Sequence, residues 1–199
     1  PSASGGDSAR VLAKEWAVKA SKANMSGKYD DAFLCAEMAL QTDPDYADAY
    51  NNLGTALENK GQIDEAISQY QEAVRIKPDY ALAHYNLGIA LGMKGQIEEA
   101  VSRYREAVRL KPDYAEAHNN LGNALGRKGQ IDEAISRYQE AIRLKPDYAE
   151  AHYNLGVALR MKGQVDEAIS QYQEAVRLKP DYAEARNNLG DARARKRQI

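Results

Sequence analysis

The sequence contains little cysteine, tryptophan or phenylalanine, and little net charge. Its 199 residues include one Cys, one Trp and one Phe. The single cysteine, Cys35, cannot form an intrachain disulfide, so no oxidising compartment is indicated and we expect a cytoplasmic protein. The net charge of -2 lacks the excess of Lys and Arg that a nucleic-acid or acidic-membrane surface needs. We therefore expect no nucleic-acid partner.

Long apolar runs are also missing. None approaches the roughly 20 residues needed to cross a bilayer, so we expect no membrane partner. Residues 1–10 lack the apolar core of a signal peptide. Because the chain begins at Pro1, a leader removed before this residue stays an alternative. Residues 1–8, which include several Ser and Gly, predict a flexible tail.

What the sequence does contain is an internal repeat. The tetrapeptide Lys-Pro-Asp-Tyr occurs at 77–80, 111–114, 145–148 and 179–182, in steps of 34 residues. A period of this length is typical of repeat architectures. Four regular repeats follow from it, which we number first to fourth: 47–80, 81–114, 115–148 and 149–182. A degenerate repeat, 13–46, precedes them, and a partial repeat, 183–199, follows.

Each repeat predicts two helices. In the third repeat the first helix is expected over 115–128, and Gly129 ends it because glycine accepts the left-handed conformation. The second helix is expected over 131–144, and Pro146 ends it because proline cannot continue the hydrogen-bond ladder. Asp147 is then predicted to cap the next helix, with Glu150 three residues later. The same spacing recurs at Asp113/Glu116 and Asp181/Glu184.

A helical wheel separates two faces of each first helix. Counting from the first Ala of a repeat, one face has positions 4, 7, 8 and 11, which in the third repeat are His118, Leu121, Gly122 and Leu125. This face should pack on the second helix, where small, large and small side chains alternate at Ala134, Tyr138 and Ala141. The opposite face is predicted to point outward: Glu116, Asn119, Asn120, Asn123, Gly126 and Arg127.

This pattern resembles the tetratricopeptide repeat family. The matching residues in the first repeat are Leu53, Gly54, Ala66, Tyr70, Ala73 and Pro78, and the next three repeats match equally. The resemblance covers about residues 9–199 and implies one all-α, right-handed α-solenoid of helix-turn-helix repeats. It also implies that the first helices line a concave surface and that the protein binds another protein or a peptide rather than catalysing a reaction.

Position 6 is asparagine in five successive repeats: Asn52, Asn86, Asn120, Asn154 and Asn188. Neighbouring first helices lie about 10 Å apart, while an extended peptide advances about 3.3 Å per residue. One carboxamide per repeat could therefore meet every third residue of a bound strand. The series resembles the asparagine ladder of the repeat domain in O-linked N-acetylglucosamine transferase. The alternative is that these side chains only solvate the groove.

Specificity is predicted to come from two apolar patches that alternate with polar repeats. The patch residues are Leu82, Tyr85, Ile89 and Met93 in the second repeat and Tyr153, Val157 and Met161 in the fourth. Exposed Tyr and Met together are typical of adaptable binding surfaces. The alternative is that one patch packs against a neighbouring helix or another copy of the chain.

Other kinds of site are not indicated. The lysine clamp that holds a C-terminal carboxylate in some members of the family is missing at position 5. His84, His118 and His152 occupy equivalent places in successive repeats, too far apart for the roughly 2 Å bonds of one zinc ion, and predict a structural role. We expect no metal, no cofactor and no catalytic residues. Cys35 is expected to be a small packed residue.

The partial repeat leaves three functional hypotheses. The leading one is an interaction module that binds an extended segment of a partner protein. The second is the substrate-recruiting arm of a larger enzyme such as a glycosyltransferase. The third is a self-associating scaffold, in which copies pair through the C-terminal helix. The cluster Arg193, Arg195, Lys196 and Arg197 fits a polar capping helix, but a fragment of a longer protein or an exposed sticky end would also account for the partial repeat.

Overall fold

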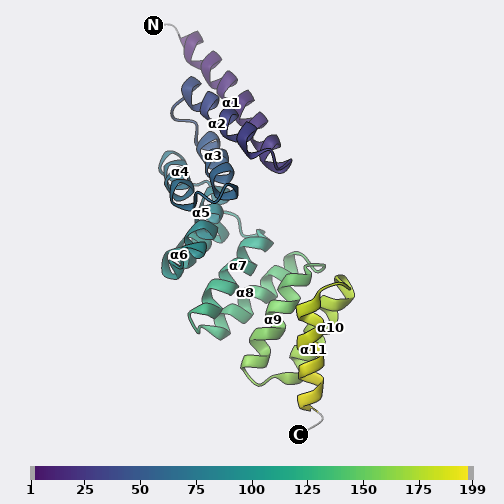
Figure 1. The fold of residues 1–199 in the computed structure, drawn as a ribbon. Coiled ribbons are helices and arrows are strands. Elements are labelled where there is room, and N and C mark those ends of the chain that lie inside the picture. Colours follow the sequence, from purple (N-terminus) through teal and green to yellow (C-terminus); the bar gives the residue numbers. More distant parts are fainter. Residues whose placement is uncertain (1–2, 197–199) are drawn as a thin grey trace. The chain divides into compact units, whose positions relative to one another are not determined.

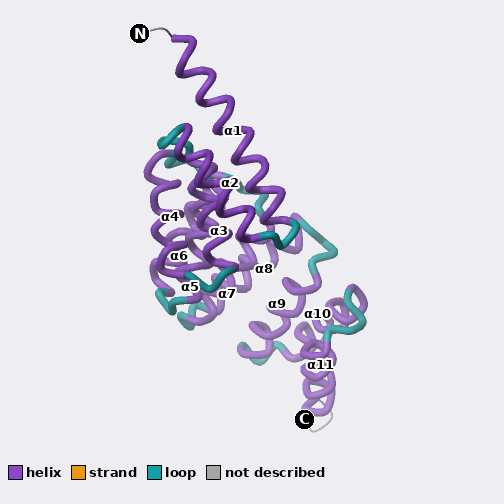
Figure 2. Tube along the Cα trace, turned by 45° about the horizontal axis from the view of Figure 1, so that its top comes forward, coloured by secondary structure: helices purple, strands orange, loops and turns teal. Residues whose placement is uncertain are grey.

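Helix pairs follow one another through the described chain. The computed structural model describes residues 3–196, and every regular element in this part is an α-helix joined to the next by a short loop (Figures 1 and 2). The helices are α1 (Ala3–Met25), α2 (Tyr29–Thr42), α3 (Ala47–Asn59), α4 (Ile63–Ile76), α5 (Ala81–Met93), α6 (Ile97–Leu110), α7 (Ala115–Arg127), α8 (Ile131–Leu144), α9 (Ala149–Met161), α10 (Val165–Leu178) and α11 (Ala183–Lys196). The all-α fold class is confirmed.

The predicted helix boundaries agree closely with the structure. In the third repeat α8 has the predicted limits, and α7 ends one residue early, with Lys128 as its C-cap. Gly129 then has φ +76°, and Gly27, Gly61, Gly95 and Gly163 have similar values. These five turns need the left-handed conformation that glycine adopts at little cost.

The N-terminal end differs from the flexible tail predicted over 1–8. Helix α1 begins at Ala3, so residues 3–8 form its first turns, while residues 1 and 2 lie outside the described part. Once a helix is nucleated, each further residue adds one hydrogen bond for one pair of dihedral angles. That gain extends α1 upstream of the repeat pattern.

The chain divides into two structural units. The N-terminal unit reaches Leu110 and holds α1–α6, and the C-terminal unit begins at Lys111 and holds α7–α11. Within the first unit α2 packs on α3 and α4 on α5, and within the second α8 packs on α9 and α10 on α11. Each unit therefore stacks consecutive helix pairs. The single solenoid domain over 9–199 stays a prediction.

The two helices of each regular repeat meet at a glycine–tyrosine contact. A Cβ added to Gly122 of α7 would come within 2.6 Å of the ring of Tyr138 in α8, closer than real Cβ contacts allow. Leu121 and Leu125 beside it are fully buried. The equivalent contacts are Gly54 with Tyr70, Gly88 with Tyr104 and Gly156 with Tyr172. We call this contact the seam, and it explains why glycine stands at position 8.

The histidines also belong to the seam. His84, His118 and His152 are buried, and in each the Nε2–H donates to a proline carbonyl six residues earlier. The distance from His118 Nε2 to the Pro112 oxygen is 2.9 Å. The bond ties the first helix to the loop before it, so the predicted structural role is confirmed.

The predicted aspartate caps of α7 and α9 are wrong, while that of α11 stays a prediction. The N-cap of α9 is Tyr148, that of α7 is Tyr114, and neither makes a side-chain capping bond. Asp147 instead offers its backbone carbonyl to the N–H of Ala149 at 3.1 Å. The turn after Pro146 places the aspartate one residue before the cap position, so its carboxylate is out of register with the first helical N–H groups.

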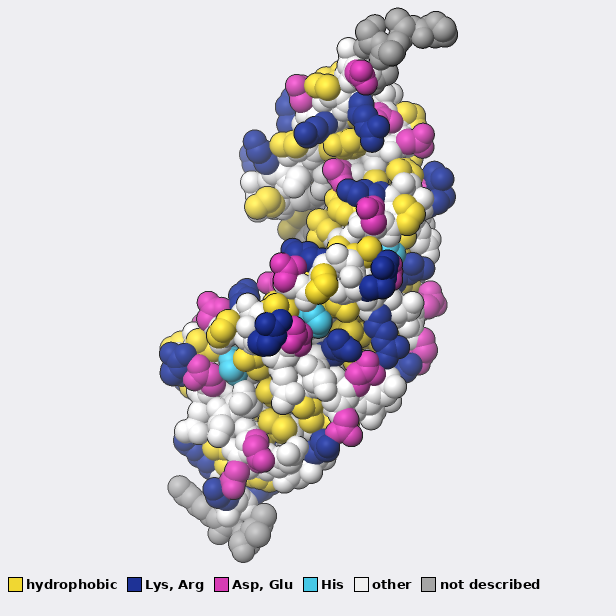
Figure 3. Space-filling view, turned by 180° about the vertical axis from the view of Figure 1, so that it is seen from behind, with side chains coloured by type: hydrophobic (Ala, Val, Ile, Leu, Met, Phe, Trp, Pro, Cys, Tyr) yellow, Lys and Arg dark blue, Asp and Glu magenta, His cyan; other side chains and the backbone are white. Residues whose placement is uncertain are grey.

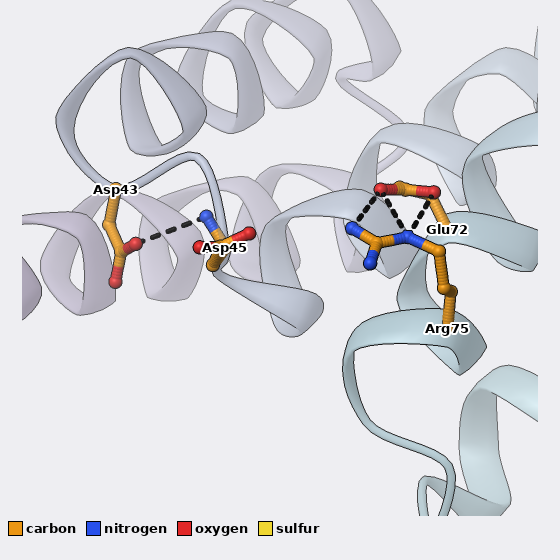
Figure 4. A network of polar contacts seen from close by, with 4 residues as sticks. All are labelled: Asp43, Asp45, Glu72 and Arg75. Carbon is orange, nitrogen blue, oxygen red and sulfur yellow. Dashed lines mark hydrogen bonds and ion pairs between the residues drawn. The ribbon is translucent and has the colours of Figure 1, made fainter.

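Ion pairs between a glutamate and an arginine lie on the second helices of both units. Arg75 of α4 binds Glu72 at 2.6 Å, and the turn before α3 is closed by Asp43 Oδ1, which accepts the N–H of Asp45 at 3.1 Å (Figure 4). The Glu–Arg pair recurs as Glu106–Arg109, Glu140–Arg143 and Glu174–Arg177. Such exposed helical pairs contribute little to stability, because water and salt screen the charges. On the face shown in Figure 3, acidic and basic side chains are interspersed.

A second set of ion pairs links successive repeats. Lys94 at the end of α5 binds Asp64 at the start of α4 at 2.9 Å. The equivalent pairs are Lys60–Asp30, Lys162–Asp132 and Lys196–Asp166. The acidic residues at the start of the second helices therefore do more than complement the helix dipole. They also bind the following repeat.

Helix α11 carries a polar version of the seam. Ala185 and Ala192, which face the preceding repeat, are buried as in other first helices. At positions 4 and 11, where the second to fourth repeats have buried His and Leu, α11 has exposed Arg186 and Arg193. The charged side chains allow this face to meet water, and the capping role of α11 stays a prediction. Arg197 of the basic cluster lies outside the described residues.

Candidate functional site

The predicted binding residues lie on the side of the first helices opposite the seam. We call positions 2, 5, 6, 9, 12 and 13 of these helices the outward face. The most exposed of the predicted binding residues are Leu82 (41% exposed), Met93 (60%) and Met161 (63%). The other predicted residues are half-buried: Asn52, Asn86, Asn120, Asn154, Asn188, Tyr85, Ile89, Tyr153 and Val157. The apolar patches of the second and fourth repeats are thus accessible.

The position 6 asparagines are hydrogen-bonded between repeats. In the N-terminal unit, Asn86 Nδ2 donates to Asn51 Oδ1 at 3.0 Å, and Asn52 Nδ2 donates to the Ala17 carbonyl at 2.9 Å. In the C-terminal unit, Asn154 Nδ2 donates to Asn119 Oδ1 at 3.0 Å. Each bond joins a first helix to the first helix before it. The sequence did not indicate this use of the amides.

The acceptor in the last of these bonds is a tyrosine. Asn188 Nδ2 donates to the hydroxyl of Tyr153 at 3.1 Å. The ring of Tyr153 also lies 5.0 Å from that of Tyr182 and 6.0 Å from that of Tyr172. These contacts hold Tyr153 in one orientation at the centre of the fourth-repeat patch.

Two residues predicted to face outward are buried instead. Asn51 is 3% exposed and Asn119 is 2% exposed. Position 5 lies at the edge of the outward face, where the next repeat covers it, and its amide oxygen accepts the bond from position 6 of that repeat. Since a buried amide needs hydrogen-bond partners, the position 5–position 6 pair explains why both can be asparagine.

At Asn86 and Asn154 the interrepeat bond uses the amide nitrogen and not the amide oxygen. No described residue donates a hydrogen bond to Oδ1 of Asn86 or of Asn154. An amide whose nitrogen is fixed presents its oxygen in a defined direction. Each of these oxygens can therefore accept an N–H from a bound molecule without breaking the bond between repeats.

The C-terminal unit has a groove beside this ladder. It has a volume of about 460 Å³ and lies between α9 and the pair α7/α8. Four of the predicted residues line it: Tyr153, Asn154, Val157 and Met161. The opposite side is formed by residues that the sequence did not single out as a site, including Tyr138, Gly126 and Arg127. The sequence feature that could have indicated this side of the groove is Gly126, which has no side chain at position 12 of the third repeat.

The seam tyrosines reach the outward face with their hydroxyls. Tyr138 donates to Asn123 Oδ1 at 2.8 Å, whereas Tyr70 donates to Glu58 Oε2 at 2.9 Å. Burial raises the pKa of both tyrosines, so each stays a neutral donor. Burial also raises the pKa of the Glu58 carboxyl, and the bond from Tyr70 offsets part of that rise.

The described residues contain no group of three or more His, Cys, Asp or Glu side chains placed to hold a metal. Within the same part of the chain, no helix is both long and apolar enough to span a bilayer. Cys35 is a free, half-buried thiol.

Family models identify the repeat. Models described as tetratricopeptide repeat or TPR repeat match residues 35–68, 59–95, 91–129, 120–183 and 162–198. The chain is a tetratricopeptide-repeat (TPR) protein. No curated protein matches it.

Solved structures of other TPR proteins share the fold. MamA is 28% identical with a TM-score of 0.72, covering 83% of this chain and 96% of its own. YrrB, described as a TPR protein with an unusual peptide-binding site, is 27% identical with a TM-score of 0.71, covering 84% of this chain and 87% of its own. TTC0263, a thermophilic TPR protein of Thermus thermophilus, is 25% identical with a TM-score of 0.69, covering 90% and 98%.

Proposed function

We propose that this TPR protein is a non-catalytic interaction module that holds an extended peptide segment of a partner protein against the outward face. The observation that carries the proposal is the pair of amide oxygens at Asn86 and Asn154, each fixed by an interrepeat bond and each next to exposed apolar side chains. An extended peptide presents regularly spaced N–H donors together with side chains, which fits both features. The peptide-binding site named for YrrB supports the same role.

A selection from short random peptides displayed on phage tests the proposal. Peptides enriched on the protein are synthesised, and their affinities are measured by fluorescence anisotropy for the wild type and for the double variant Asn86→Ala, Asn154→Ala. We expect the double variant to bind about fivefold more weakly whichever unit holds the peptide, since each unit loses one hydrogen bond of about 0.5–1.5 kcal/mol.

The matched control is Ser68→Ala, Ser136→Ala, which alters exposed residues of the second helices α4 and α8. It should leave the affinity unchanged. Failure to enrich any peptide, or equal loss of affinity in both double variants, would show that the outward face is not a peptide-binding surface. Circular dichroism confirms that each variant is folded.

Self-association through α11 is the competing proposal. Exposed Arg186 and Arg193 disfavour it, because copies that meet along this face would bring like charges together. Light scattering coupled to size-exclusion chromatography should therefore give a constant mass near 22.0 kDa over a range of concentrations. A mass that climbs with concentration would favour the scaffold instead.

A further inference from the structure

Two places on the outward face have the same apolar wall. The first place is on α5 in the N-terminal unit and the second is on α9 in the C-terminal unit. Both helices carry a tyrosine, an asparagine, a β-branched aliphatic residue and a methionine at positions 5, 6, 9 and 13. They are Tyr85, Asn86, Ile89 and Met93 in α5, and Tyr153, Asn154, Val157 and Met161 in α9. Differences in what these places bind must come from the preceding first helix.

The preceding helices differ in size and charge at positions 12 and 13. In the N-terminal unit, α3 has Glu58 and Asn59, and the carboxylate of Glu58 lies against the Tyr70 hydroxyl at 2.9 Å. In the C-terminal unit, α7 has Gly126 and Arg127. The N-terminal unit places a half-buried carboxylate beside the seam tyrosine, whereas the C-terminal unit leaves space there and adds a cation.

Packing does not require the glycine at 126. A Cβ added there would meet only the Tyr138 hydroxyl, at 3.8 Å, which is ordinary contact. This contrasts with Gly122, where the added atom would lie 2.6 Å from the Tyr138 ring. Gly126 is the next-to-last residue of α7, and glycine is a poorer helix former than alanine. The helix therefore keeps an unfavourable residue at a site where a larger one fits.

The space left by Gly126 is the groove of about 460 Å³ described above. Val157, Met161 and the ring of Tyr153 supply apolar surface, and Tyr153 is held in place by Asn188 and Tyr182. Arg127 is the one charged residue among those that line the groove. A ligand that complements it has an apolar side chain next to a negative charge.

We propose that this groove is an anchor pocket for one large apolar side chain of an extended partner segment that carries a carboxylate side chain beside it. Gly126 gives the room for the apolar side chain, and Arg127 selects the carboxylate. The proposal rests on the proposed peptide-binding function and adds the chemistry of the partner. The equivalent place in the N-terminal unit disfavours the same segment, because the Glu58 side chain stands where Gly126 has none and brings a negative charge.

The four methionines provide separate reporters. Met161 lines the groove, Met93 lies at the equivalent place in the N-terminal unit, Met25 occupies position 13 of the degenerate repeat and Met38 lies on the second helix α2. Labelling the methionine methyl groups with carbon-13 gives one resonance for each, and Met→Leu substitutions assign them. NMR titration also detects the weak binding expected of a short peptide.

The probes are short capped Gly/Ser peptides with a central Asp-Leu-Asp, Lys-Leu-Lys or Asp-Ala-Asp. We expect the Met161 resonance to shift with the Asp-Leu-Asp peptide at about fivefold lower concentration than with Lys-Leu-Lys, the size expected for an exposed ion pair. The Asp-Ala-Asp peptide should bind more weakly than Asp-Leu-Asp, because burial of the larger side chain is lost. Met38 should not respond.

Exchanging the two residues between units provides the matched test. In Gly126→Glu, Arg127→Asn, the preference at Met161 should reverse towards the lysine peptide. In Glu58→Gly, Asn59→Arg, the Met93 resonance should gain the preference for the acidic peptide. The single variant Arg127→Asn, which keeps Gly126 and therefore the groove, should abolish the charge preference if the double variant does not fold.

Three outcomes would overturn the anchor pocket. They are an equal response of Met161 to acidic and basic peptides, a preference that survives Arg127→Asn, and a response confined to Met93 or Met25. In each case the peptides still bind, so the proposed function stands. If no methionine methyl resonance shifts with any of the three peptides, the anchor pocket is also overturned. The phage selection then decides whether the proposed peptide-binding function is wrong as well.

Discussion

The two structural units have the same seam under different outward faces. Gly54 lies against Tyr70 in the N-terminal unit as Gly122 lies against Tyr138 in the C-terminal unit, with the same 2.6 Å from the ring to an added Cβ. The tyrosine hydroxyls then find different partners, Glu58 in one unit and Asn123 in the other. The repeat thus conserves volume at the seam and varies charge and size on the outward face. Stability and recognition are carried by different positions.

The largest effect is expected from enlarging the seam. Gly122→Val should lower the free energy of unfolding by about 2–3 kcal/mol, because the new side chain overlaps the Tyr138 ring and the close-packed helices must separate. The matched control is Gly190→Val at the same position of α11, where no neighbouring heavy atom lies within 4 Å of an added Cβ. Urea unfolding followed by circular dichroism measures both. Equal losses would contradict the seam as the cause.

A smaller effect is expected from uncoupling two repeats. In a double-mutant cycle, Asn119→Ala and Asn154→Ala should show an interaction energy of about 1 kcal/mol, the value of one partly buried hydrogen bond. The same cycle on Asn51 and Asn86 should give a similar value in the N-terminal unit. Additive losses would mean that the amide pair does not link the repeats. Exposed Asn187 provides a neutral control when changed to alanine.

The smallest effect is expected from pH and is confined to one unit. Burial raises the folded-state pKa of Glu58 above the usual 4.5, so the folded state binds a proton more readily than the unfolded state. Stability contributed by this group is therefore gained as pH falls through the folded pKa towards about 4.5. Glu58→Gln should be more stable than the wild type at neutral pH, and the difference should shrink on acidification.

Glu140 provides the control of opposite sign. A hydrogen bond from Arg143 lowers the pKa of this exposed carboxyl, so its contribution is present at neutral pH and is lost as pH falls through the folded pKa. Glu140→Gln should be slightly less stable than the wild type at pH 7 and equal to it in acid. Urea midpoints at several pH values measure both variants. The same pH trend in both would contradict burial as the cause for Glu58.

Most of the fold could be predicted because the same helix and turn signals recur in every regular repeat. Periodicity placed α8 at its observed limits, and Gly129 marked the turn before it. The aspartate caps failed because a capping box depends on register, and the turn after Pro146 shifts the register by one residue. Local pattern thus determined which residues are helical more reliably than it determined which group caps a helix.

The candidate site could be predicted only in part. A helical wheel treats a helix in isolation, so it placed Asn119 among outward residues although the next repeat buries it. The 30-residue separation that recurs between Asp64 and Lys94 was visible in the sequence, but only the stacking of repeats brings those two residues together. The groove over Gly126 could not be foreseen from apolar pattern, because an absent side chain leaves no hydrophobic signal.

The links between repeats also bear on how such a chain can evolve. Each of these links joins residues at a fixed separation, such as 35 from Asn119 to Asn154 and 30 from Asp132 to Lys162. A duplicated segment of 34 residues therefore contains a hydrogen-bond donor for the repeat before it and an acceptor for the repeat after it. Insertion by unequal recombination keeps every partner in register, and the new copy is then free to diverge where it meets a ligand.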